Sequence, residues 1–379
     1  MNFRTSDAIF RRDKGKPPRF YRGDLTFCFA LCVIVAGCHD RGQTSAPVAD
    51  KTVPEQTLSW TGRTMGTTFR VVVWAEETRD VTTGYLDQKL LEQRVKERLT
   101  QINQRMSTYQ ADSELSQFNV APPHRWFSVS PETAHVVEAA IGYHRATNGM
   151  LDVTIGPLVR LWGFDDSSKM TQQGPTHEQI QDVLKRVGSQ YVRVRSEEKK
   201  QAALQKIVKG LEIDVSSLAK GYAVDQLVAL LRQAGGAGGL VEIGGEVRAW
   251  GHRADDRMWR VGIENPLIEG RTLAQIVKLD NAALATSGDY RNFRSYRSGR
   301  VSHLIDPRTG MAQSTGPRSV SVCAKTCMES DALATALFLM GQQEGLAWSE
   351  DNGVAAMFLT IENGKLNKAF SSHFAPYLE

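Results

Sequence analysis

Apolar and polar positions follow two different periods along the chain, and each period predicts a different element. From Leu58 to Ala75 the positions alternate and include Val71-Val72-Val73, which predicts one or two strands interrupted at Met65-Gly66. Apolar residues then recur at helical spacing, which predicts a long amphipathic helix. These residues are Leu86, Leu90, Val95, Leu99, Ile102 and Met106.

Capping residues mark the ends of two further helices. Ser130-Pro131 supplies a cap and a proline at the first helical position, and Asn148-Gly149 suits the end of the same helix. Thr176, with Gln179 three residues later, has the pattern of a capping box. We therefore expect one helix between the first two pairs and another that begins after Thr176.

The second half of the chain has mostly strand-like patterns. Strands are predicted around 191–194, 211–215, 240–243, 259–263, 273–279, 301–305, 319–322 and 354–360. Helices are predicted over 218–233 and 331–340, with another turn of helix after the second. Helices and strands are mixed without the regular alternation of a doubly wound sheet. The sequence therefore favours an α+β fold.

The composition is that of an ordinary globular protein whose net charge is confined to one end. The chain has 379 residues, of which 41% are hydrophobic and 23% charged, and its net charge is +4. Residues 1–37 hold seven Lys or Arg and three Asp, so they account for the whole excess and the remainder is neutral. A neutral body gives no electrostatic reason to expect a nucleic-acid partner.

A basic segment at the start of the chain leads into an apolar run from Leu25 to Gly37. The run is too short to span a bilayer comfortably, which takes about 20 residues, and it suits the core of an export signal. Val35-Ala36-Gly37-Cys38 is typical of a bacterial lipoprotein processing site, at which the Cys38 thiol takes the lipid. An uncleaved anchor and a chance cysteine are the alternatives.

These features divide the chain into a lipoprotein signal peptide over 1–37, a flexible tether over 38–57 and a folded body over 58–379. The tether is polar and contains Pro47 and Pro54. We expect a protein that faces the periplasm and is held to a membrane by its lipid alone. His39 stands where an inner-membrane retention signal often has Asp, which slightly favours the outer membrane.

Besides Cys38, the expected mature chain has two cysteines, Cys323 and Cys327. Their spacing is not Cys-x-x-Cys, and no second pair completes a zinc site. A local disulfide and two separate thiols are both compatible with this spacing.

The chain lacks the standard motifs of serine hydrolases, zinc proteases and P-loop nucleotide-binding proteins. Three other polar clusters combine residue types suited to phosphates or cations. The first, 214–221, places Asp214, Ser217 and Lys220 where a predicted strand leads into a helix. Free N–H groups at a helix start suit a phosphate, and a simple helix cap is the alternative.

The second and third clusters lie nearer the C-terminus. In the second, 303–310, His303 precedes an Asp-Pro turn, and a lone histidine of this kind is more often structural than catalytic. In the third, Asp331 and Thr335 are four residues apart and share a helix face. Two oxygen ligands on one face suit a hard cation such as Mg²⁺, and again a helix cap is the alternative.

Seven motifs occur together in one order along the chain. They are Met65-Gly66-Thr67, Ser107-Thr108-Tyr109, 149–159, 214–221, 286–291, 303–310 and 331–335. In this order the sequence resembles the ApbE family, the FAD:protein FMN transferases once labelled thiamine-biosynthesis lipoproteins. The resemblance covers roughly Leu58 to Tyr377, and the lipoprotein leader is similar too.

The resemblance implies a fold and a reaction. The fold would be α+β with a mixed sheet, related to the tunnelling fold, with FAD in a cleft between two lobes. In the reaction, FAD and a Ser or Thr hydroxyl of an acceptor protein give a phosphoester-linked FMN and AMP, with Mg²⁺ as the usual cation. The acceptors would be flavoproteins with a short Ser/Thr motif, such as subunits of membrane redox complexes.

The resemblance also implies roles for individual residues. Contacts with FAD are expected from Met65, Tyr109, Met150, Leu151, Asp152, Asp214, Lys220 and Ile305. The magnesium positions match Ser217, Asp331 and Thr335, of which position 217 varies in the family. A cation and a lysine would neutralise a pyrophosphate during its cleavage.

Proton removal from the acceptor hydroxyl needs a base. His303 is the candidate, because histidine titrates near neutral pH. An aspartate as the base, or a His303 that only orients FAD, remain alternatives. Two further functions are also open: a pyrophosphatase that cuts FAD to FMN and AMP, and a flavin-binding lipoprotein without catalysis.

Overall fold

The computed structural model describes residues 55–76, 86–165, 173–197, 201–267, 272–289, 293–296 and 299–379. The predicted signal peptide, Cys38 and most of the predicted tether lie outside these residues. Within these ranges, none of the helices has the length and apolar character needed to cross a membrane.

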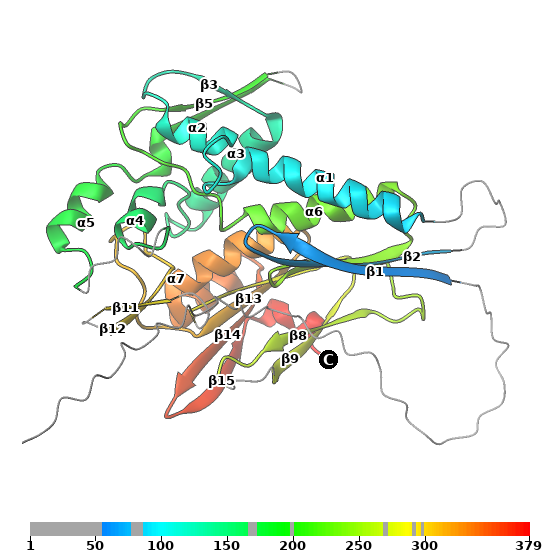
Figure 1. Cartoon of the computed structure of the whole chain (residues 1–379). Helices are drawn as coiled ribbons and strands as arrows, with labels where there is room; N and C mark the ends of the chain where they lie inside the picture. Colours follow the sequence, from blue (N-terminus) through cyan, green and yellow to red (C-terminus); the bar gives the residue numbers. More distant parts are fainter. Residues whose placement is uncertain are drawn as a thin grey trace, which may run out of the picture.

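An eight-stranded sheet forms the centre of the fold (Figure 1). In spatial order its strands are β1 (Glu55–Thr64), β2 (Thr67–Glu76), β6 (Gly238–Ile243), β7 (Glu246–Trp250), β10 (Ala283–Gly288), β13 (Ser319–Ala324), β14 (Ala355–Glu362) and β15 (Lys365–Phe370). Each neighbouring pair is antiparallel. The parallel pairing found in the described residues is an isolated bridge between Ile155 and Glu212.

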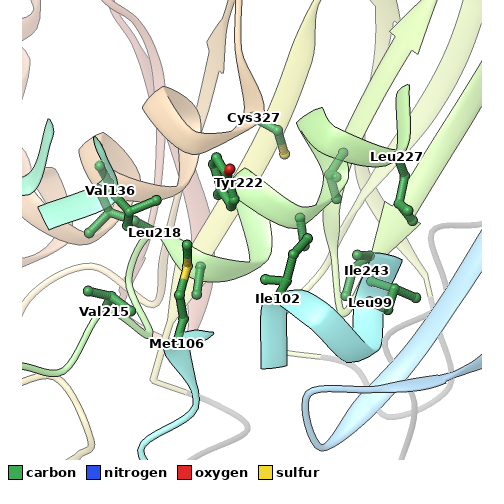
Figure 2. Close-up of a cluster of buried hydrophobic side chains, with 14 of the residues drawn as sticks. Leu99, Ile102, Met106, Val136, Val215, Leu218, Tyr222, Leu227, Ile243 and Cys327 are labelled. Atoms are coloured by element: carbon green, nitrogen blue, oxygen red, sulfur yellow. The ribbon is translucent and has the colours of Figure 1, made fainter. Parts of the chain in front are cut away.

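Three helices cover one face of this sheet, the upper face in Figure 1. They are α1 (Gln88–Met106), α6 (Ala219–Gln233) and α7 (Cys327–Asp351). Figure 2 shows how α1 and α6 interlock, with Ile102 and Met106 facing Leu218 and Tyr222. Because these side chains are almost fully buried, the ends of α6 and α7 rest on a rigid core.

The opposite face of the sheet is covered by the hairpin of β8 (Trp259–Glu264) and β9 (Leu273–Leu279) and by the short 3₁₀ helix η3 (Ser372–Tyr377). The side chains of successive strand residues therefore pack into hydrophobic clusters on opposite faces of the sheet. Val241 packs on the helical side and Leu240 on the hairpin side, and Phe358 and Met357 divide in the same way. This two-sided burial follows from the period of two along a strand.

Smaller elements complete the described structure. The sheet of β3 (Phe127–Val129), β5 (Gln201–Lys206) and β4 (Val192–Glu197) packs with α3 (Pro131–Ala146), and α2 (Glu114–Val120) packs on α1. A separate core includes α4 (Gly156–Leu161) and α5 (His177–Leu184). The remaining elements are η2 (Ser189–Tyr191), β11 (Phe293–Tyr296) and β12 (Gly299–Ser302).

The α+β class and several local predictions are confirmed. The β1–β2 hairpin turns at Met65-Gly66, where both residues have positive φ, as a two-residue turn of this kind requires. Ser130 caps α3 through the Thr133 N–H. At α5, Thr176 and Gln179 form both hydrogen bonds of a capping box.

Other predictions are corrected. The predicted strand over 211–215 is reduced to an isolated bridge between Glu212 and Ile155. At Ile213 the backbone is bound by a side chain instead: the Asn119 amide accepts from the Ile213 N–H and donates to the Ile213 carbonyl. The sheet begins at Glu55, so the last three residues of the predicted tether belong to β1. The strand predicted over 301–305 ends at Ser302.

The last helix is longer than predicted, and the structure decides between the two alternatives for the cysteines. The helix predicted over 331–340 begins four residues earlier and continues as α7 to Asp351, across a non-helical Gly341. Cys323 and Cys327 are free, buried thiols that belong to different hydrophobic clusters. The structure therefore has two separate thiols there.

Candidate active site

The N-terminal ends of α6 and α7 cross at very short range. A Cβ atom at Gly221 would lie 2.3 Å from the Cys327 carbonyl oxygen and 2.7 Å from the Met328 Cα, so only glycine fits this crossing. The Gly221 N–H also donates a 3.0 Å hydrogen bond to Oδ2 of Asp331 on α7. The close approach thereby brings Lys220 and Asp331 together.

Asp225 fixes the same crossing from the other side. Its Oδ1 accepts from the Cys327 N–H at 2.9 Å, and its Oδ2 accepts from the Met328 N–H at 3.0 Å. Arg248 of β7 donates to Oδ1 at 2.6 Å. A carboxylate at a helix N-terminus satisfies free N–H groups and interacts favourably with the helix dipole. Each helix therefore receives a carboxylate from the other at its first turns.

Lys220 lies between two buried carboxylates at this crossing. Its Nζ is 3.2 Å from Oε1 of Glu246 and 3.7 Å from Oδ1 of Asp331. Burial raises the pKa of Asp331 to about 7, opposed by the Lys220 ammonium and reinforced by the Glu246 carboxylate. Burial lowers the pKa of Lys220, but the carboxylates of Asp331 and Glu246 outweigh burial and raise it above its ordinary value. Two carboxylates thus share one ammonium.

The oxygen atoms around Asp331 suit a divalent cation. Thr335 lies one helical turn further along α7, and its Oγ1 is 3.1 Å from Oγ of Ser287 on β10. Oε2 of Glu246 is buried and has no hydrogen-bond partner among the described residues. A divalent cation would balance the excess negative charge, and Mg²⁺ commonly keeps water and phosphate oxygens as ligands. The predicted ligands Asp331 and Thr335 therefore fit the ion.

The described residues contain no cluster of three or more His, Cys, Asp or Glu that could hold a metal by itself. A cation here would therefore take several ligands from substrate and water, which matches the chemistry of Mg²⁺ better than that of Zn²⁺. Ser217, the third predicted ligand, lies in the turn before α6 and three residues before Lys220. Chain connectivity places it at the same helix end.

Asp214 lies at this helix end, and its charge acts on Tyr109. The Asp214 carboxylate accepts from the Ser216 N–H at 2.9 Å and from the Ser216 hydroxyl. Partial burial of the hydroxyl, together with the carboxylates of Asp214 and Asp165, raises the pKa of Tyr109. The Tyr109 side chain is nevertheless 80% exposed, so its ring is available to stack on a planar ligand.

His303 contacts Phe164, which packs against the separate core of α4 and α5. The two rings meet edge to face, with centroids 6.4 Å apart. The charge of Asp165, which follows Phe164, contributes to the raised pKa of Tyr109. Ile305 is buried and forms an isolated bridge with Ala312. His303 and Ile305 are therefore held by the turn that the sequence indicated.

The predicted contact residues 150–152 are more deeply placed. Met150 and Leu151 are buried. The Asp152 carboxylate accepts from the N–H and hydroxyl groups of both Thr154 and Ser189 at 2.6–3.0 Å. His144 Nδ1 lies 3.2 Å from it. These side chains hold the loop together, and their contact with FAD stays a prediction.

Met65 occupies the turn of the β1–β2 hairpin, where it packs half-buried against the main core. The Asn103 amide of α1 donates to Oγ1 of the adjacent Thr64 at 3.1 Å, which ties the turn to α1. Of the predicted site residues, Lys220 and Asp331 meet directly at the α6–α7 crossing. Met65 is placed instead by the hairpin of β1 and β2.

Sequence reasoning missed Glu246 and Asp225 and did not single out Ser287. Glu246 follows Gly244-Gly245, both with positive φ, in the β6–β7 hairpin. A carboxylate directly after such a turn, at the start of a buried strand, was the available signal. Ser287 falls within the motif 286–291, whose last residues, 290 and 291, lie outside the described part of the chain.

Comparison with known proteins gives the class that this fold and site define. The family model described as "ApbE family" matches residues 65–358, so the chain belongs to the ApbE family. A relative from Vibrio cholerae named "FAD:protein FMN transferase" is 36% identical over 325 residues, which are 86% of this chain and 94% of the relative.

Solved structures agree with this placement. The flavin transferase ApbE from Vibrio cholerae is 36% identical, has a TM-score of 0.75, and the match covers 86% of this chain and all of that one. The apo form of the flavinyl transferase ApbE from Pseudomonas stutzeri is 31% identical, also with a TM-score of 0.75, over 84% of this chain and 96% of that one.

Proposed function

We propose that this protein transfers FMN from FAD to a Ser or Thr hydroxyl of another protein and releases AMP, with Mg²⁺ bound at Asp331 and Thr335. Close relatives of nearly the same length bear the name of this transferase. The observation that carries the proposal is the α6–α7 crossing, where Lys220, Asp331 and the first N–H groups of two helices converge.

The reaction exchanges one phosphoester bond for another. The acceptor oxygen attacks the phosphorus next to riboflavin, a new P–O bond forms, and the bond to the bridging oxygen breaks so that AMP leaves. Lys220 would stabilise the negative charge that builds up on the phosphates. Mg²⁺, when bound, supplies charge neutralisation to the same oxygens. Ser217 would complete its protein ligands.

We assign binding of the flavin to exposed and half-buried residues near this helix end and in the β1–β2 turn. Tyr109 offers an aromatic face, the charge of Asp214 acts on it, and Met65 lines the hairpin turn. Residues 150–152 and Ile305 shape the loops behind them. The acceptor hydroxyl gives its proton to a base, and His303 is the residue assigned to this step.

The chain is further proposed to be a lipoprotein, with its lipid on Cys38 and its body facing the periplasm. Its acceptors would then be exported or membrane-bound flavoproteins, including subunits of redox complexes. Replacement of Cys38 by Ser tests the anchor: membrane fractions should retain the original protein and lose the variant. Equal retention of both would contradict the lipid anchor.

Variants of α7 test the cation site. Asp331→Ala should abolish Mg²⁺-dependent AMP release and leave part of the FAD binding, measured by flavin fluorescence. Glu344→Ala, which removes an exposed carboxylate from the same helix, is the matched control and should behave as the original protein. Full Mg²⁺-dependent turnover by Asp331→Ala would contradict the assignment.

His303→Ala separates the two roles that this histidine can have. As the base, His303 contributes to transfer more than to binding, so transfer should fall on the order of 100-fold or more while the FAD affinity changes little. An unchanged transfer rate would remove His303 from the mechanism. Equal losses in binding and transfer would instead make it a residue that orients FAD.

A further inference from the structure

Glu246 is held rigidly at the start of β7. It follows the tight β6–β7 turn, pairs across the hairpin with Ile243, and precedes the fully buried Val247. The residue itself is 4% exposed. Oε1 lies 3.2 Å from Nζ of Lys220, and Oε2 contacts no hydrogen-bond donor in the described part of the chain. A buried carboxylate with a free oxygen is costly, so its retention calls for a reason.

The Lys220 ammonium lies near two carboxylates, Glu246 and Asp331, and these two differ in their other contacts. Asp331 also accepts a hydrogen bond from the Gly221 N–H and is the proposed ligand of the cation, whereas Glu246 forms an ion pair with Lys220. An ammonium and a divalent cation repel each other and attract the same oxygens. If Asp331 were the sole partner of Lys220, the ammonium would compete directly with the cation.

We propose that Glu246 is a positioning residue that holds the Lys220 ammonium on the sheet side of the site and so leaves Asp331 to the cation. This inference rests on the proposed cation site at Asp331. In the structure the ammonium is already closer to Glu246 than to Asp331. Glu246 thus allows two positive groups, Lys220 and the cation, to act on one pyrophosphate.

The experiment measures direct Mn²⁺ binding, by electron paramagnetic resonance, to the whole protein without FAD at about pH 8, where carboxylates are ionised. Glu246→Gln keeps the size of the side chain but gives up its charge, so Lys220 should turn to Asp331 and Mn²⁺ affinity should fall about ten-fold. Glu246→Asp retains the charge and should restore most of the affinity.

The Lys220→Met background separates positioning from direct attraction. Without the ammonium there is no competitor, so Lys220→Met alone should bind Mn²⁺ more tightly than the original protein. In that background Glu246→Gln should change the affinity by less than about two-fold, as a double-mutant cycle isolates the coupling of the two residues. Glu242→Gln, which removes another buried carboxylate from the same hairpin, is the matched control and should have little effect.

The outcomes are distinct. Equal weakening by Glu246→Gln with and without Lys220 would overturn the inference, because Glu246 would then act on the cation directly. No weakening in either background, or weakening by Glu242→Gln of the same size, would overturn it as well. Asp331→Asn that binds Mn²⁺ as tightly as the original protein would instead contradict the cation site, and with it the proposed function on which the inference rests.

Discussion

Replacement of Gly221 by Ala tests whether the α6–α7 crossing builds the site. The new Cβ would lie 2.3 Å from the Cys327 carbonyl oxygen and 2.6 Å from its carbonyl carbon, and both are backbone atoms that no rotamer change can move. Carbon atoms in good contact lie about 3.5–4.0 Å apart, so α7 must withdraw by roughly 1 Å.

The cost follows from this displacement. Overpacking of a tight core destabilises a protein by about 1–3 kcal/mol, and the upper part of this range applies because the obstacle is backbone. The higher helix propensity of Ala offsets up to about 1 kcal/mol. We therefore expect Gly221→Ala to lower the free energy of unfolding by about 2 kcal/mol. A shift of about 1 Å at Asp331 should also lower the transfer rate on the order of 100-fold.

Gly142→Ala provides the matched control. Gly142 is an exposed residue of α3, and a Cβ at this position would meet no atom within 4 Å. This substitution should raise the free energy of unfolding by about 0.5–1 kcal/mol and leave transfer unchanged. Urea unfolding and AMP release measure both properties. A Gly221→Ala protein with the original stability and rate would refute the account of the crossing.

Three further predictions concern residues around the site. The hydrogen bond to Asp152 raises the pKa of His144. Burial raises the pKa of Asp152, but its hydrogen bonds outweigh burial and lower it. The ion pair between the two residues is therefore complete above the ordinary aspartate pKa and is lost as pH rises through the histidine pKa. His144→Gln should therefore lower the free energy of unfolding most near about pH 5–6 and less above about pH 8, and a loss that grows with pH would contradict this. Asp225→Ala removes the acceptor of the Cys327 and Met328 N–H groups of α7 and the partner of Arg248, and should cost about 2–3 kcal/mol in urea unfolding; an unchanged midpoint would contradict this role of Asp225. Tyr109→Ala should change stability by less than about 0.5 kcal/mol but weaken FAD binding about ten-fold, whereas Tyr109→Phe should bind normally, and equal binding by both would exclude stacking.

Local sequence signals gave the elements whose structure is decided locally. The caps at Ser130 and Thr176 and the turn at Met65-Gly66 depend on residues within three positions of each other, so the pattern alone was sufficient. The segment 211–215 has alternating apolar residues but forms only an isolated bridge, Glu212 with Ile155, and Asn119, far away in the sequence, binds the backbone of Ile213. Periodicity shows which residues are buried, and here it could not show what they pair with.

The candidate site divides in the same way. Asp331 and Thr335 could be paired from the sequence because they are four residues apart on one helix. Their relation to Lys220 came from the family resemblance, and the role of Glu246 came only from the structure. Lys220 and Glu246 are brought together by the packing of α6 against β7, a contact that no local pattern contains.

In the proposed reaction the protein transfers FMN to another protein. The most direct measurement follows the intact mass of an acceptor that carries the family's Thr motif, together with AMP release, in the presence of FAD and Mg²⁺. We expect a mass gain equal to one phosphoester-linked FMN and AMP release that depends on the acceptor. AMP released equally without an acceptor would show a FAD pyrophosphatase, and bound FAD without AMP in either case would show a flavin carrier; both would contradict the account.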